Sequence, residues 1–232
     1  MIRKLIKMRM RIRIWCSVLL AIYLPISATA QKRDFGIWYG VSADKKLTDK
    51  IDIRLSTCIR TFENAAKIEE AFLEGGLAYS FSNYFAIGGS YRLTENIENN
   101  NSYYFRHKWF VDFKGNLPVS DFSFSWRFRF QTRIKTFIVD AKDKFPDYTG
   151  LIKLKALYKT PSFPVHPYLY SESFCPMFSD NTRMIGKNRL AAGVEFSISK
   201  RYSIAAEYIF QRIYLPHISD INIISINYNI EL

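Results

Sequence analysis

Apolar and polar side chains alternate with a period of two along most of this chain, most clearly in the segment from Phe122 to Lys135. One face of that segment carries Phe122, Phe124, Trp126, Phe128, Phe130 and Ile134, and the other carries Ser123, Ser125, Arg127, Arg129, Gln131, Arg133 and Lys135. In a helix these two sets would be mixed around the whole circumference. The alternation therefore predicts a β-strand with one apolar and one polar face.

The same alternation recurs along the chain, and the segments between the predicted strands differ in length. Further alternating stretches cover residues 51–60, 105–114, 152–159, 189–198, 204–211 and 224–232. Short connections at 47–50, 82–83, 115–121 and 199–201 fall between longer polar ones at 63–69, 95–102, 139–148 and 176–187. Short turns on one rim and long loops on the other are typical of outer-membrane barrels.

Alternation alone does not say which face of each strand points inward, because a soluble barrel or sandwich produces the same pattern. Three features favour a membrane barrel. The strands reach the roughly ten residues that a tilted membrane strand needs, aromatic residues gather at strand ends, as in Tyr84-Phe85, and the chain ends in a strand. The sequence therefore predicts an all-β protein, a single antiparallel transmembrane β-barrel of about 10–12 strands.

The predicted number of strands conflicts with a general property of such barrels. We count about eleven strands, whereas bacterial barrels normally have an even number so that both termini lie on the same side. We therefore expect either that one strand is miscounted or that one end does not pair. The segment before Lys50 is the expected place of the error.

The first thirty residues have the organisation of a secretory signal peptide. A basic stretch up to Arg13 precedes an apolar run from Ile14 to Ile26, and Ser27-Ala28-Thr29-Ala30 offers a cleavage site. The apolar run is short for a membrane span, which disfavours the alternative of an uncleaved anchor. We expect residues 1–30 to be a signal peptide and 31–232 to be a barrel domain, exported through the general secretory pathway to the outer membrane of a Gram-negative bacterium.

Charge and cysteine content limit the partners of the processed protein. The formal net charge is +12, and subtracting the six basic residues of the first thirty leaves +6, a moderate excess that suits anionic lipid or a small anionic solute. Export makes nucleic acid the weakest candidate, so the expected partners are outer-membrane lipid, lipopolysaccharide, the barrel-assembly machinery and an anionic solute. Cys58 and Cys175 could form a disulfide, but we expect free thiols.

Short motifs along the chain resemble those of a family of outer-membrane β-barrel proteins of Gram-negative bacteria known only as a domain of unknown function. The motifs are Phe35-Gly36-Ile37-Trp38, Gly88-Gly89-Ser90-Tyr91-Arg92, Tyr104-Phe105-Arg106-His107-Lys108, Arg127-Phe128-Arg129-Phe130-Gln131, Pro167-Tyr168-Leu169 with Glu172-Ser173-Phe174, and Asn188-Arg189-Leu190 with Gly193-Val194-Glu195. The chain departs from such barrels by ending on Leu232 instead of an aromatic residue. The resemblance implies the fold and the location, and it implies no known activity.

If the apolar faces meet lipid, the polar faces line a lumen that is rich in charge. The candidate lumen residues are Arg54, Arg60, Arg92, Arg106, Lys108, Asp112, Arg127, Arg129, Arg133, Lys153, Lys155, Glu172, Arg189, Glu195 and Glu207. Because unpaired buried charge is costly, the favoured interpretation is a structural network of ion pairs that plugs a narrow barrel. The alternative is a constriction whose surplus of arginines selects anions.

Catalytic, metal and cofactor motifs are absent from the sequence. The three histidines, His107, His166 and His217, occur in no recognisable nucleophile motif; His107 falls on an apolar face and His166 on a predicted turn. Cys58 and Cys175 lack neighbouring metal ligands, so we expect no metal or cofactor and no enzymatic activity. The leading hypothesis is a porin-like narrow pore or a structural envelope component. The alternatives are an outer-membrane enzyme acting on lipid or polysaccharide and a soluble periplasmic ligand-binding β-barrel.

Overall fold

The computed structural model describes residues 33–97, 103–136, 145–161, 163–178 and 184–232, and these residues form strands and turns only. The strands are β1 (Arg33–Lys46), β2 (Ile51–Phe62), β3 (Lys67–Ser80), β4 (Phe85–Ile97), β5 (Tyr103–Val119), β6 (Phe122–Lys135), β7 (Asp147–Tyr158), β8 (Val165–Met177), β9 (Lys187–Ser197), β10 (Tyr202–Ile213) and β11 (Ser219–Glu231). No helix in these ranges has the length and apolar character needed to cross a membrane. The predicted signal peptide, 1–30, lies outside the described residues.

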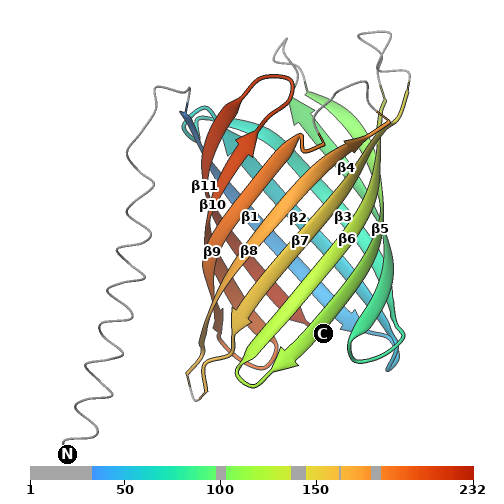
Figure 1. Cartoon of the computed structure of the whole chain (residues 1–232), viewed down its shortest axis with the longest axis vertical. Coiled ribbons are helices and arrows are strands. Elements are labelled where there is room, and N and C mark those ends of the chain that lie inside the picture. Colours follow the sequence, from blue (N-terminus) through green and yellow to red (C-terminus); the bar gives the residue numbers. More distant parts are fainter. Residues whose placement is uncertain (1–32, 98–102, 137–144, 162, 179–183) are drawn as a thin grey trace, which may run out of the picture. The chain divides into compact units, whose positions relative to one another are not determined.

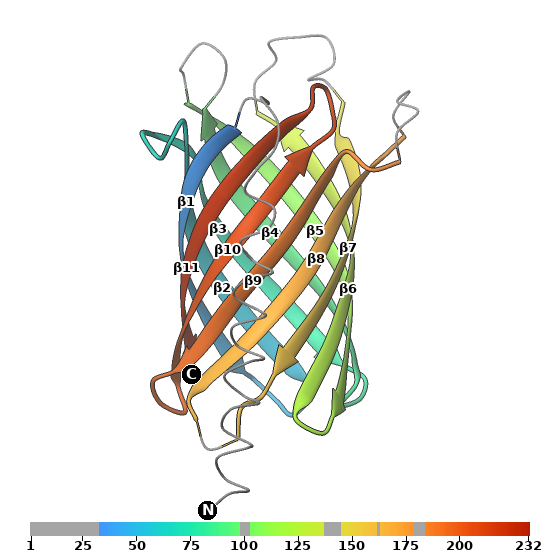
Figure 2. The same cartoon turned by 60° about the vertical axis from the view of Figure 1, so that its left-hand side comes forward.

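The strands close into one barrel in sequence order. Each strand pairs with its neighbours in the chain, and β1 and β11 pair with each other to complete the ring (Figures 1 and 2). The strands are inclined to the barrel axis, as closure of a sheet requires. The prediction of an all-β, single-barrel fold is confirmed.

The structure corrects the expectation about strand number. Eleven strands are present and both ends pair, so neither a miscounted strand nor an unpaired end is needed. With an odd number of strands β1 and β11 run in the same direction, and they therefore join as a parallel pair, in continuous register from Arg33↔Asp220 to Asp44↔Glu231. A parallel ladder also satisfies the backbone groups of two edge strands, so the barrel has no free edge. The other pairs are antiparallel, as predicted.

The two rims differ in the length of their connections. Strands joined by the short connections 47–50, 81–84, 120–121, 159–164 and 198–201 meet at the rim where β11 ends, and strands joined by the two longest connections, 136–146 and 178–186, meet at the other. We call these the short-turn rim and the long-loop rim. Four predicted connections are shorter than expected: β5 continues to Val119, β3 begins at Lys67, β4 continues to Ile97 and β8 continues to Met177. The turn before β3 is tight because the Asp34 carboxylate accepts hydrogen bonds from the backbone N–H groups of Glu63 and Asn64, at 3.0 and 2.9 Å.

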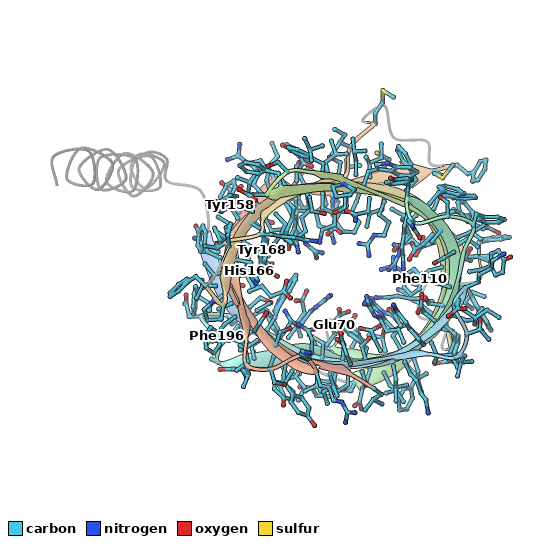
Figure 3. The ribbon with its side chains drawn as sticks, turned by 90° about the horizontal axis from the view of Figure 1, so that it is seen from below. Glu70, Phe110, Tyr158, His166, Tyr168 and Phe196 are labelled. Carbon is cyan, nitrogen blue, oxygen red and sulfur yellow. The ribbon has the colours of Figure 1, made fainter. Side chains whose placement is uncertain are left out.

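The apolar faces of the strands point outward and the charged faces point inward. Leu73, Leu154 and Leu169 on the outer wall are 55%, 57% and 63% exposed, whereas Asp112 and Glu172 inside are 2% and 5% exposed. Viewed from the short-turn rim, Glu70, Phe110 and Tyr168 lie inside the ring, and Tyr158 and Phe196 lie outside it (Figure 3). This distribution is the reverse of a soluble barrel, in which charge faces water and apolar side chains fill the core.

The closing strand leaves no room for a side chain at Gly36. A Cβ atom added there would lie 2.4 Å from the backbone oxygen of Thr61 on β2. We expect Gly36→Ala to force β1 away from β2 and to lower the free energy of unfolding by about 1–3 kcal/mol, measured by urea unfolding in detergent micelles. Gly75→Ala is the matched control, because its nearest atom, Cδ1 of Leu55, is 4.0 Å away. Equal free energies of unfolding for the two variants would contradict a close approach of β2 to β1 at Gly36.

Candidate functional site: a basic lumen

A cavity of about 860 Å³ occupies the barrel interior. It is lined from Asp52 and Glu231 near the short-turn rim up to Lys108 and Lys187 in the half of the barrel nearer the long loops. Among the described residues that line it, twelve carry basic side chains and seven carry acidic ones. The lumen therefore combines open space with a net positive charge.

Arginines and aromatic rings alternate around much of the lumen wall. The Trp38 ring lies between the guanidinium carbons of Arg60 and Arg189, at 4.1 and 4.7 Å from its centroid. In the same way Phe72 lies between Arg92 and Arg60, at 3.7 and 5.1 Å. Guanidinium groups are stabilised over aromatic faces, most strongly where water is excluded.

The alternation continues onto β5 and β6. The Phe110 ring lies between Arg129 and Arg92, at 4.2 and 5.1 Å. We call the full set the arginine–aromatic belt; its members are Arg189, Trp38, Arg60, Phe72, Arg92, Phe110 and Arg129. The belt is one reason why this lumen accommodates more basic than acidic groups.

Ion pairs anchor the members of the belt. Arg129 donates two hydrogen bonds to the Asp112 carboxylate, at 2.6 and 2.7 Å. Arg92 donates to Glu74 at 2.7 Å. Such bidentate or charge-assisted hydrogen bonds are the strong ones in proteins.

Two carboxylates each hold two basic groups. Glu70 pairs with Arg60 and with the Lys108 ammonium, the latter at 3.4 Å. Glu172 accepts from Arg127 at 2.9 Å and from Arg189 at 3.1 Å. The belt and its carboxylates thus form one connected network across β1 to β6, β8 and β9.

The lysines of β7 have a different environment. The Lys153 ammonium lies 3.5 Å from the Tyr170 ring centroid, and the Lys155 ammonium lies 4.0 Å from that of Tyr168. The hydroxyl of Tyr168 donates to Glu207 at 2.9 Å, and that of Tyr170 donates to the same carboxylate at 3.4 Å. Among the described residues no carboxylate lies within ion-pair distance of either lysine, although Glu172 is opposite Lys153 in the register, so the ring faces are their direct contacts.

The structure brings most of the predicted lumen residues into one network and places the others at the two ends. The central group is Arg60, Arg92, Lys108, Asp112, Arg127, Arg129, Lys153, Glu172, Arg189 and Glu207. Arg54 pairs with Asp44 near the short-turn rim at 2.6 Å, and Lys155 and Glu195 lie toward the same rim. Arg106 and Arg133 lie toward the long-loop rim, where Arg133 donates to Asp147 at 2.9 Å.

Sequence reasoning missed the apolar part of the lumen. Ile209 and Ile223 are 0% and 1% exposed and pack with Trp38 in a buried cluster on the inner wall, and Phe110 is 4% exposed. Two interruptions of the polar faces could have revealed the aromatic members: Phe72 follows Glu70 two residues on, and Phe110 follows Lys108. An aromatic residue inside an otherwise charged face therefore indicates a packing partner for arginine. Glu70 and Lys187 also belong to the lumen and were not singled out.

The histidines and cysteines lie apart from one another. His107 faces outward, as predicted, with Nδ1 2.5 Å from the Tyr91 hydroxyl. The prediction that His166 lies in a turn is wrong: it belongs to β8, and its Nδ1 accepts from the Thr160 backbone N–H at 3.2 Å. Cys58 and Cys175 are free thiols, as expected. In the described ranges no three metal-ligating side chains come together.

Comparison with known proteins supports the resemblance found in the motifs. No curated protein matches the chain. A family model described as "Protein of unknown function (DUF2490)" matches residues 35–222, which begin in β1 and end in β11. The chain therefore belongs to this uncharacterised family of proteins, DUF2490.

Proposed function

We propose that this barrel spans the outer membrane and conducts small anions through its lumen. The observation that carries the proposal is the cavity of about 860 Å³, in which basic side chains outnumber acidic ones among the described lining residues. A water-filled passage with this charge balance concentrates anions and repels cations. The passage is narrow because the arginine–aromatic belt fills part of the interior.

The outward-facing wall supports the membrane location. Large apolar side chains that are 40–60% exposed, such as Val111, Leu117 and Leu190, occupy outer positions of the strands. Hydrocarbon tails would remove this surface from water, and a closed barrel satisfies every backbone group that a bilayer cannot. Outer-membrane lipid and lipopolysaccharide are then the surrounding partners, and the barrel-assembly machinery inserts the chain.

The proposal assigns no enzymatic role. A membrane-embedded hydrolase needs a nucleophile within hydrogen-bond reach of a base. His107 bonds to a tyrosine on the outer wall, and His166 bonds to a backbone N–H near the short-turn rim. Cell fractionation would separate the proposal from the soluble alternative, since a protein recovered in the soluble periplasm could not be this pore.

Single-channel recording tests the pore directly. In planar bilayers under a potassium chloride gradient, we expect the purified protein to give small conductance steps and a reversal potential on the anion-selective side. Lys187→Glu is expected to shift the reversal potential toward cation selectivity, because Lys187 lines the cavity, where its ammonium lies 4.0 Å from the Phe174 ring centroid.

The matched control is Lys67→Glu. This side chain begins β3 at the long-loop rim, is 45% exposed and pairs with Glu63 instead of lining the cavity. Its reversal potential should equal that of the unmodified protein. Absence of any conductance, or an equal shift in both variants, would refute the anion pore.

A further inference from the structure

Three neighbouring strands place basic side chains directly opposite one another in the lumen. In the register of the sheet, Lys114 of β5 pairs with Arg127 of β6, and Arg127 pairs with Lys153 of β7. Each of the three lies in the half of its strand nearer the short turns. Like charges in directly opposed positions destabilise a sheet, so this arrangement costs stability unless something neutralises it.

A second row of basic residues shows how the protein neutralises such charge elsewhere. Arg92, Lys108 and Arg133 are also in direct register, on β4, β5 and β6. Each forms an ion pair with a carboxylate: Arg92 with Glu74, Lys108 with Glu70, which also pairs with Arg60, and Arg133 with Asp147. Repulsion in this upper row is therefore compensated within the described chain.

The lower row, Lys114, Arg127 and Lys153, is less well compensated, because its carboxylates are shared with other arginines. Lys114 is 3.9 Å from Asp112, whose two oxygens already bind Arg129. Arg127 shares Glu172 with a second arginine, and its buried Nε has no hydrogen-bond partner among the described atoms. Lys153 lies over the ring of Tyr170 and opposite Glu172 in the register, but that carboxylate already accepts from Arg127 and Arg189.

The three basic side chains of the lower row line a recess next to the main cavity. Its volume is about 440 Å³, and Lys155 lies two residues beyond Lys153 in its lining. The described lining residues include five basic side chains, those of Arg54, Lys114, Arg127, Lys153 and Lys155, and no acidic one. The recess therefore has the volume for a small multivalent anion and the charge to neutralise it.

We propose that Lys114, Arg127, Lys153 and Lys155 form a binding site for a phosphate-bearing anion near the short-turn rim. The inference rests on the proposed function, since the site would bind the anions that the pore conducts. Phosphate fits because its several oxygens can accept from an arginine fork and from separate ammonium groups at once. The phosphate could belong to a soluble ester or to a phospholipid headgroup at the rim, and the chemistry of recognition is the same.

Thermal unfolding with an added anion tests the site without any ion flow. The full processed protein in nanodiscs of zwitterionic lipid is heated while its β circular dichroism is followed, with sodium tripolyphosphate or sodium acetate at equal ionic strength. Because a ligand of the native state raises the midpoint, we expect tripolyphosphate to stabilise the protein and acetate not to. Lys153→Gln should weaken the apparent tripolyphosphate affinity by about tenfold or more, since a charged hydrogen-bond donor is lost.

Three further measurements make the result specific. Lys153→Arg retains the charge and should retain the affinity. Arg133→Gln removes a compensated charge of the upper row and should also leave the affinity unchanged. Without anion, Lys153→Gln should unfold close to the temperature of the unmodified protein, because the relieved repulsion with Arg127 offsets the lost attraction to Glu172 opposite.

The outcomes separate the site from its ligand source and from the pore. Stabilisation by tripolyphosphate that is lost only in Lys153→Gln supports the site for a soluble phosphate. The same measurement is repeated in nanodiscs that contain phosphatidylglycerol and no tripolyphosphate. If only this lipid stabilises the protein, and Lys153→Gln abolishes the effect, the site binds a phospholipid headgroup. Equal affinity in all variants, or no stabilisation by either source, overturns it. Binding is measured without an applied voltage. A protein that binds tripolyphosphate but does not conduct ions would therefore support the binding site and refute the pore.

Discussion

Asp112→Ala is expected to lower the free energy of unfolding by about 3–5 kcal/mol, because it leaves a buried guanidinium without its counter-ion. Asp112 is 2% exposed, and the Arg129 side chain that donates to both of its oxygens is 9% exposed. The Phe110 ring on one side of Arg129 does not replace the lost carboxylate. Urea unfolding in detergent micelles, followed by circular dichroism, measures the effect.

Two further variants establish that the loss comes from the orphaned charge. The double variant Asp112→Ala with Arg129→Met should recover a large part of the stability, since no charge then remains buried alone. Asp147→Ala removes the partner of Arg133 near the long-loop rim, where the Asp147 side chain is 55% exposed, and should cost no more than about 1 kcal/mol. If Asp112→Ala and Asp147→Ala had the same effect, the lumen would be as well solvated as the surface.

Leu73→Arg is expected to destabilise the folded barrel in a bilayer by about 2–4 kcal/mol, the cost of a cation at the middle of a lipid-facing wall. Leu73 lies in the middle of β3 and is 55% exposed. In a water-soluble protein the same substitution of an exposed leucine would be nearly neutral. Unfolding of the protein in phospholipid vesicles measures the difference directly.

The depth of the substituted residue provides the control. Tyr84 lies in the turn between β3 and β4 at the short-turn rim and is 59% exposed. Tyr84→Arg should cost roughly 0–1 kcal/mol, because the guanidinium reaches the headgroup region. A neutral effect of Leu73→Arg would mean that the apolar wall does not face hydrocarbon, and the pore would then have no membrane to cross.

The lumen has features of both interpretations considered for it, a network of ion pairs that plugs the barrel and a constriction that selects anions. Ion pairs such as Arg129–Asp112 and the Glu172 bridge form the network expected of a plugged barrel. The cavity that remains, with its surplus of basic side chains, is what a selective passage requires. The arginine–aromatic belt reconciles the two, because arginines that stack on rings of the wall narrow the lumen and still leave a cavity beside them.

Much of the local structure could be predicted from alternation. The segment from Phe122 to Lys135 was predicted as a strand with its arginines on one face, and β6 has those bounds with Arg127 and Arg129 inside. The prediction succeeds because successive side chains of a strand point to opposite faces whatever the strand pairs with. It fails at strand ends, as at Val119, because pairing with a neighbouring strand decides where a strand stops.

What the sequence alone determined is therefore the set of strands, the division of each into an apolar and a charged face, and the all-β class. What only the tertiary structure decided is which face points inward, how the eleventh strand meets the first, and which charges are balanced. The physical reason is that alternation is a property of one strand, whereas closure brings together residues from distant strands. Arg189 and Trp38 stack only because β9 and β1 curve around the same lumen, and Lys153 lies between Arg127 and Glu172 only because pairing places β6 and β8 on either side of β7.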